Sequence, residues 1–209
     1  MRRLDRSIVP PPACLSGYHH SRNCWDDVSA ASKDEIRKSL EAMQGRKCAY
    51  CEGPLDSLRH HIEHFRRRHD FPHLTFDWSN LFWSCDQPDS CGRYKDGKAG
   101  RYNVNDLIDP CIDDPDRFFR FRSDGTISIR PGLSPADVRR AQETLRVFNL
   151  NPEGGRLRNM RRTVVSPYVS MVDGVNFSAQ ELKEFFAEEL RNAADLPFFT
   201  AIRHVLTEP

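Results

Sequence analysis

The sequence contains no long apolar run and almost no excess of charge of one sign. No stretch of the 209 residues approaches the roughly twenty apolar residues of a membrane-spanning helix, and the first residues lack the apolar segment of a signal peptide. The 31 Lys and Arg nearly balance the 30 Asp and Glu, which excludes a uniformly basic nucleic-acid-binding protein. We therefore expect a cytoplasmic protein with no membrane contact, and any nucleic acid must be bound by local patches.

A nucleotide-binding loop is also absent. No Gly-x₄-Gly-Lys-Ser/Thr segment is found, so any dependence on ATP must come from a partner. Hydrophobic residues make up only 38% of the chain, which indicates a modest core and a well-solvated surface.

Cysteines, in contrast, are plentiful, and four of them have the spacing of metal ligands. The chain has seven cysteines and no export signal, which favours reduced thiols and a metal over disulfides. Cys48 and Cys51 form one pair, and Cys85 and Cys91 form a second pair downstream. A lone Cys-x-x-Cys could be a redox pair, but two pairs can share one tetrahedral Zn²⁺. The sequence therefore predicts a structural zinc site.

Between the two pairs lies a segment with catalytic side chains. Residues 58–65 alternate in the manner of a strand, so that His61 and Glu63 face one way. Glu63 and His64 can line one site only if the strand ends or bulges there. Residues 74–83 are rich in aromatics and predict a second strand or a strand-like loop, interrupted at Ser79–Asn80, and residues 92–96 predict the first turn of a helix. The expected order is strand, loop, strand, helix, within an α+β protein.

The flanking regions predict helices and one hairpin. Ser32-x-x-Glu35 has the form of a capping box for a helix over residues 32–44 that stops at Gly45. Residues 117–130 predict a hairpin with its turn at Asp124–Gly125. Further helices are expected after Ser134, from about Leu157 and after Ser178. We divide the chain into an N-terminal arm and helix (1–46), a zinc-knuckle core (47–105), and a hairpin with C-terminal helices (106–209).

This arrangement resembles the HNH, or ββα-metal, nuclease fold with a zinc knuckle of four cysteines. Glu63-His64 matches the pair on the first strand of that family, which implies that Glu63 is a ligand of a catalytic Mg²⁺ or Mn²⁺ and His64 the general base. Asn80 matches the middle Asn of the family, which orients the base. The last family ligand falls on Gly92, which has no side chain. One helical turn later stands Asp96, the position that the resemblance offers as the second metal ligand.

Other segments are similar to one subfamily, the PtuB-like effectors of Septu-type and retron-associated anti-phage systems. They include Cys-Ala-Tyr-Cys-Glu52, Ile-Glu-His-Phe65, Cys-Gly-Arg-Tyr-Lys-Asp96 and Thr-Leu-Arg-Val-Phe-Asn-Leu-Asn151. The resemblance implies a toxic nuclease that cuts DNA or tRNA and works with an ABC-type, PtuA-like ATPase. Retron msDNA and its reverse transcriptase are possible further components. We expect the C-terminal part to bind the partner.

Several residues around the motif are expected to contact nucleic acid. They are His61, Arg66, Arg67, Arg68, Arg93 and Lys95. For the arginine run a solvated charged face is an equal alternative, and His61 could instead brace the metal. Two functions stay open from sequence: a metal-dependent HNH endonuclease, or a zinc-knuckle module that binds nucleic acid or protein and whose nuclease centre is degenerate.

Overall fold

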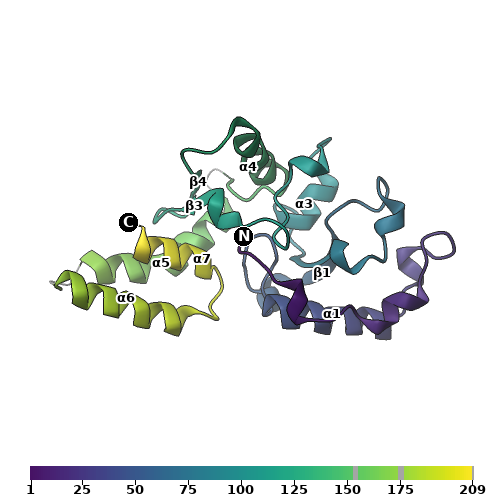
Figure 1. Cartoon of the computed structure of the whole chain (residues 1–209), viewed down its shortest axis with the longest axis horizontal. Helices are drawn as coiled ribbons and strands as arrows, with labels where there is room; N and C mark the ends of the chain where they lie inside the picture. The colour runs from purple at the N-terminus through teal and green to yellow at the C-terminus, as the bar shows by residue number, and fades with distance from the viewer. Residues whose placement is uncertain (153–154, 174–176, 209) are drawn as a thin grey trace.

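A computed structural model describes residues 1–152, 155–173 and 177–208. The protein is α+β, as predicted, and its described apolar residues form one continuous core. Figure 1 shows a group of C-terminal helices at one side and the cysteine-rich core with α1 at the other, joined by β3, β4 and α4. Among the described residues, no helix is long and apolar enough to cross a membrane.

Helix α1, Ala30–Gln44, covers β2 and ends as predicted. Gly45 has φ +66, the left-handed conformation that terminates a helix at glycine. The predicted N-terminal cap is wrong, because Ser29 and not Ser32 accepts the capping hydrogen bond. Glu35 is not part of a capping box, since its carboxylate accepts a hydrogen bond from the Cys14 amide (3.1 Å) and thereby holds the N-terminal arm.

The central unit is a two-stranded antiparallel sheet followed by a helix. Strand β1, His60–His64, pairs with β2, Leu81–Cys85, so that His64 faces Leu81 and His60 faces Cys85. Helix α3, Cys91–Gly97, follows and packs on β2. The short α2, Leu55–Leu58, precedes β1. The predicted order of strand, loop, strand and helix is confirmed.

The second strand begins later than predicted. Residues 72–80 form two 3-10 turns, η4 (Pro72–Leu74) and η5 (Trp78–Asn80), and not a strand. The Asp77 carboxylate accepts a hydrogen bond from the Ser79 amide (2.7 Å), and such a local side-chain bond competes with strand pairing. The other 3-10 helices are η1 Arg6–Ile8, η2 Ala13–Gly17, η3 Trp25–Asp27, η6 Val104–Asp106 and η7 Pro115–Arg117.

The hairpin lies where it was predicted. Strand β3, Phe119–Phe121, pairs antiparallel with β4, Ile127–Ile129, and Gly125 takes a positive φ of +81 in the turn. Helix α4, Pro135–Val147, begins at the Ser134 cap. Its C-terminal end contacts the core, because the Phe148 carbonyl accepts a hydrogen bond from the Cys91 amide (2.7 Å).

Three helices complete the chain. They are α5 Arg156–Asp173, α6 Ala179–Ala193 and α7 Phe199–Thr207. The Ser178–Glu181 capping box of α6 is present as predicted. Helix α7 packs on α5, on α6 and on β3.

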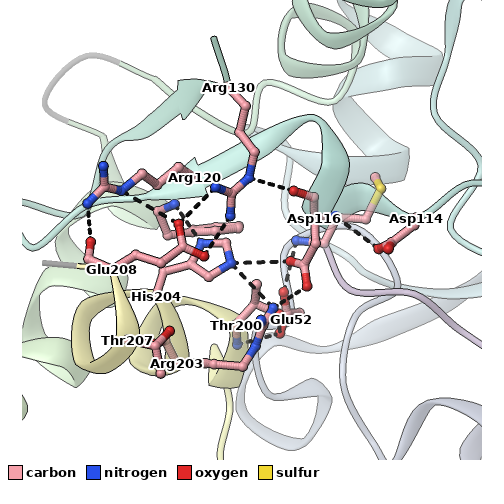
Figure 2. Close-up of polar contacts among 12 residues, drawn as sticks. Glu52, Asp114, Asp116, Arg120, Arg130, Thr200, Arg203, His204, Thr207 and Glu208 are labelled. Carbon is pink, nitrogen blue, oxygen red and sulfur yellow. Dashed lines mark hydrogen bonds and ion pairs between the residues drawn. The ribbon is translucent and has the colours of Figure 1, made fainter. Parts of the chain in front are cut away.

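A polar network fixes α7 to the rest of the protein (Figure 2). Arg130 makes a two-pronged ion pair with Glu208, with both distances 2.8 Å. The buried His204 accepts the Phe121 amide proton at Nδ1 (3.0 Å) and faces Asp116 with Nε2 (3.2 Å). At the start of the helix, the Thr200 hydroxyl donates to the carboxylate of Glu52 (2.9 Å), the residue that follows Cys51 in the chain. The C-terminal end of the described chain is therefore tied both to the hairpin and to the cysteine-rich core.

Candidate metal centre and catalytic cleft

The four predicted cysteine ligands come together. Cys48, Cys51, Cys85 and Cys91 are buried, and their sulfur atoms all lie within 4.8 Å of one another. The first pair lies on a tight turn in which the Cys48 amide donates to Gly53 and the Glu52 amide donates to Cys48. Cys85 ends β2, and Cys91 begins α3. Four sulfur atoms in this arrangement could hold one metal ion, and a set of four thiolates suits Zn²⁺.

Polar groups around the sulfurs fit an anionic thiolate cluster. The Gly53 amide lies 3.3 Å from the Cys51 sulfur and the Ser84 hydroxyl 3.8 Å from the Cys48 sulfur. Ser84 is itself held by the Gly92 amide (3.1 Å). Such outer contacts orient metal ligands and offset their negative charge.

Glu63 lies beside this cluster, deep in the protein. Its side chain is 1% exposed, and Oε1 forms an ion pair with Nζ of the fully buried Lys95 at 2.7 Å. Burial opposes ionisation of Glu63, but the charge of Lys95 and the hydrogen bond with His61 outweigh it and lower the pKa of Glu63 to about 2. Glu63 is therefore a carboxylate at neutral pH.

Lys95 stands between the two carboxylates that the sequence assigned to one metal ion. Its ammonium group donates to Asp96 Oδ1 (2.7 Å) and to the His64 carbonyl (2.8 Å) as well as pairing with Glu63. Asp96 is half exposed and also faces Arg67 Nε (3.4 Å). The structure thus joins Glu63 and Asp96 through a lysine and not directly.

His61 contacts the other oxygen of Glu63. The two residues alternate on β1, and His61 Nε2 lies 3.0 Å from Glu63 Oε2. On its other side His61 Nδ1 lies 3.5 Å from Asp86 Oδ1, and Asp86 is paired with Arg93. His61 is therefore hydrogen-bonded to Glu63 and faces Asp86 without a hydrogen bond.

His64 has the geometry of a base with a fixed tautomer. Its Nε2 lies 3.0 Å from the Thr75 carbonyl, which can only accept, so Nε2 carries the proton and Nδ1 keeps a lone pair. The ring meets Trp25 edge-on at 4.5 Å between centroids. Burial lowers the pKa of His64 to about 4, against the opposing charge of Glu63, so the imidazole is neutral at pH 7.

Asn80 is buried and bonded on every side to the loop that follows β1. Its Oδ1 accepts from the Arg66 amide (2.7 Å), and Nδ2 donates to the carbonyls of Arg66 (3.0 Å) and Leu74 (3.1 Å). Because Thr75 follows Leu74, these bonds fix the segment that carries the partner of His64.

Glu63 and His64 both border an open cleft of about 810 Å³. Its remaining lining residues are Trp25, Asp26, His61, Ile62, Arg67, Arg68, His69, Asp70, Arg93 and Asp96. Of the predicted contact residues, Arg67, Arg68 and Arg93 reach the cleft, whereas Arg66 packs over the Phe65 ring at 5.7 Å. The prediction for Lys95 needs correction: it is buried and its donors are engaged, so it presents no group to a nucleic acid.

Both contacts of the His64 ring were missed from sequence. Trp25 belongs to the N-terminal arm, and only tertiary packing brings it to His64. The Thr75 contribution is a backbone carbonyl, which no residue type reveals. In the sequence, His64 is followed by a long loop and then by Asn80. This spacing is the local signal that could have indicated a contact between the loop and His64.

The described residues thus combine a β1–β2–α3 unit with a buried four-cysteine cluster that could hold a metal, within an α+β fold. No family model matches the chain. The chain is similar to the Septu protein PtuB of Bacillus thuringiensis, with 34% identity over 91 residues, which cover 42% of the chain and 33% of that protein. It is also similar to the Septu protein PtuB of Bacillus mycoides, with 24% identity over 151 residues, 58% of the chain and 48% of that protein.

A third relative is aligned over more of its length. It is the "Retron Vc95 putative HNH endonuclease" of Vibrio cholerae, with 25% identity over 161 residues, which cover 74% of the chain and 75% of that protein. The matches span only a third to a half of the two PtuB proteins. The resemblance found in the sequence is confirmed by these names.

Proposed function

We propose that the protein is a metal-dependent endonuclease that hydrolyses phosphodiester bonds of nucleic acid. The observation that carries the proposal is that Glu63 and His64 both line an open cleft, with His64 Nε2 held by the Thr75 carbonyl. Hydrolysis needs a base that removes a proton from water and positive charge near the phosphate, and this cleft offers both.

His64 would act through Nδ1. The Thr75 carbonyl holds the proton on Nε2, so Nδ1 is the atom free to accept a proton from water. Asn80 would act as a positioning residue, since its three bonds fix the loop that carries Thr75.

Glu63 would hold the catalytic divalent metal, Mg²⁺ or Mn²⁺, which supplies Lewis-acid stabilisation of the charge on phosphate when it is bound. Arg68 and Arg93 are exposed at the cleft and would contact neighbouring phosphates. The four cysteines would hold a structural Zn²⁺ that keeps β2 and the start of α3 together.

In biological terms we propose a nuclease effector of anti-phage defence. The relatives that carry the names Septu protein PtuB and retron HNH endonuclease support this role. The partner would be an ABC-type ATPase, with a retron msDNA and reverse transcriptase in a retron system. Met171, Phe177 and Leu196 are exposed large apolar residues of the C-terminal region, and they would belong to the partner-binding face.

The test is cleavage of DNA and of tRNA by the purified zinc-loaded protein, alone and with its ATPase, in Mg²⁺ and in Mn²⁺. Wild type should cut and His64→Ala should lose at least about a hundredfold in rate, the usual effect of removing a general base. His73→Ala is the matched control, because His73 is exposed in the same loop region and does not line the cleft. Equal cutting by wild type and His64→Ala in every metal would refute the proposal.

A second candidate is a zinc-knuckle binding module with a degenerate nuclease centre. It is favoured by Lys95, whose ammonium group lies where Glu63 and Asp96 would otherwise share a metal ion. This candidate predicts tight binding of nucleic acid or protein without cleavage under the same conditions.

A further inference from the structure

We propose that the divalent ion is held between His61 Nε2 and Glu63 Oε2, with Asp96 outside the coordination sphere, and that it is an ion which accepts imidazole, such as Mn²⁺ or Co²⁺. The inference deepens the proposed nuclease function and rests on it for the role of the ion. The proposal rests on the different contacts of the two carboxylate oxygens of Glu63.

Glu63 Oε1 is already occupied. Lys95 Nζ meets Glu63 Oε1, Asp96 Oδ1 and the His64 carbonyl at 2.7, 2.7 and 2.8 Å. Lys95 thus makes two hydrogen bonds and one ion pair, and its side chain is 0% exposed. For Glu63 and Asp96 to bind one ion together, Lys95 would have to give up contacts on both sides and leave a buried position.

Asp96 is engaged in other contacts. Its Oδ1 faces Lys95 and Arg67, two cations that already offset its charge. Asp96 thus serves as the outer partner of Lys95, which fixes the position of Oε1 on Glu63.

Glu63 Oε2, in contrast, lies 3.0 Å from His61 Nε2, and both residues line the cleft. Two ligands in adjacent positions of an octahedral ion, each about 2.1 Å from the metal, lie about 3.0 Å apart. The observed separation matches this value, and an ion bound there would replace the proton of the hydrogen bond between the two atoms. Both residues belong to the same face of β1, since they are two positions apart.

The second nitrogen of His61 faces a carboxylate but makes no hydrogen bond to it. Nδ1 lies 3.5 Å from Asp86 Oδ1, and Arg93 holds Asp86 in place. A carboxylate behind the free nitrogen is the usual way in which a ligating imidazole is oriented. Within the described part of the chain, no group of three or more side-chain ligands forms at the cleft, so most coordination positions would be left for water and phosphate oxygen.

An imidazole ligand changes which ions bind well. Mg²⁺ prefers oxygen ligands, whereas Mn²⁺, Co²⁺ and Ni²⁺ accept nitrogen, with affinity rising along that series. The site should therefore prefer these transition metals to Mg²⁺.

The experiment is Mn²⁺ binding to the full-length, zinc-loaded protein, followed by the electron paramagnetic resonance signal of free Mn²⁺. We expect His61→Ala to weaken binding by more than about tenfold and Asp96→Asn by less than about threefold. His60→Ala is the matched control, since His60 precedes His61 on β1 but packs against Trp83 and does not line the cleft. Circular dichroism and zinc content confirm that each variant is folded.

Pulsed resonance of bound Mn²⁺ gives a second readout that needs no variant to fold. Coupling to an imidazole nitrogen is expected in wild type, and its absence overturns the proposal. Weakening by Asp96→Asn that equals or exceeds the effect of His61→Ala also overturns it. If Mn²⁺ binds through His61 but no nucleic acid is cleaved, the proposed nuclease function is wrong and the His61–Glu63 site is supported. If nucleic acid is cleaved but Mn²⁺ binds through Asp96, the nuclease function is supported and the His61–Glu63 site is wrong.

Discussion

Glu63 fills the space in which a side chain at residue 92 would begin. A Cβ atom placed on Gly92 would collide with Glu63 Oε2 and lie 2.6 Å from its carboxyl carbon. Glycine at residue 92 therefore leaves room for the Glu63 carboxylate, and a side chain there would require Glu63 to move.

The first prediction follows from this contact. Gly92→Ala should displace Glu63, destabilise the protein by about 1–3 kcal/mol as overpacking does, and weaken Mn²⁺ binding. Gly97→Ala is the control on the same helix, since a Cβ there meets nothing within 4 Å. Urea denaturation measures the loss of stability, and the Mn²⁺ assay measures the loss of affinity. If Gly92→Ala and Gly97→Ala have the same stability and the same Mn²⁺ affinity, Glu63 does not depend on the absence of a side chain at residue 92.

A second prediction tests the same pair by compensation. Shortening Glu63 to Asp withdraws the carboxylate by one methylene group, which makes room for a side chain at residue 92. The double variant Glu63→Asp/Gly92→Asn should therefore retain more Mn²⁺ affinity than Gly92→Asn alone, with a coupling energy of about 0.5–3 kcal/mol. Additive effects of the two changes would argue against this coupling.

The third prediction concerns Lys95. Lys95→Met leaves Glu63 as a buried charge without its main partner, so the free energy of unfolding should fall by about 3–5 kcal/mol. Lys98→Met, in the exposed residue that follows α3, should change it by less than about 0.5 kcal/mol. A loss below about 1 kcal/mol for Lys95→Met would mean that the ion pair contributes little.

The fourth prediction concerns the four-cysteine cluster. Cys48→Ser should lower the zinc content from about one ion per chain and abolish cooperative folding, because a structural zinc site contributes directly to folding. Cys24→Ser is the control, since Cys24 is exposed and lies outside the cluster. Native mass spectrometry and thermal unfolding give the answer, and a fully zinc-loaded, stable Cys48→Ser protein would contradict the assignment.

The fifth prediction concerns pH and the network of α7. Burial opposes ionisation of Asp116, yet His204 and Arg203 lower its pKa to about 2. A lowered pKa gives stability that is complete above the ordinary value near 4 and disappears as the pH falls toward 2. Asp116 is 35% exposed, so Asp116→Asn should cost only about 1 kcal/mol at pH 7.

Urea denaturation at several pH values checks this prediction. The difference between wild type and Asp116→Asn should be the same at pH 7 and pH 5 and should shrink below about pH 4. Asp34→Asn is the control, because Asp34 is exposed and pairs with Arg37 one turn along its own helix. A difference that grows on acidification would have the wrong sign.

Much of the fold could be predicted because its signals are local. Gly45 and Ser178 terminate or begin their helices through bonds within one turn, and Asp124–Gly125 forms a turn that needs no distant partner. The cysteine pairs were equally informative, because thiolate spacing constrains a metal site before any packing is known.

The errors arose where distant contacts decide the outcome. Ser32 resembles a cap, but its hydroxyl lies against Tyr18 (3.1 Å) and Glu35 bonds the arm, so Ser29 takes the capping role. Lys95 looks like a surface lysine in the sequence, and only the fold shows that three oxygens of β1 and α3 surround its ammonium group. Tertiary contacts of this kind leave no local pattern.

The most direct test of the central claim is the chemistry of the ends that the protein leaves on cleaved RNA and DNA. Attack by a water molecule activated at His64, with departure of the 3′ oxygen, predicts 5′-phosphate and 3′-hydroxyl ends on both substrates. Cutting that is confined to RNA and leaves 2′,3′-cyclic phosphates would show that a ribose hydroxyl, and not water, is the nucleophile. That result, or intact substrate in every metal with the ATPase present, would contradict the account.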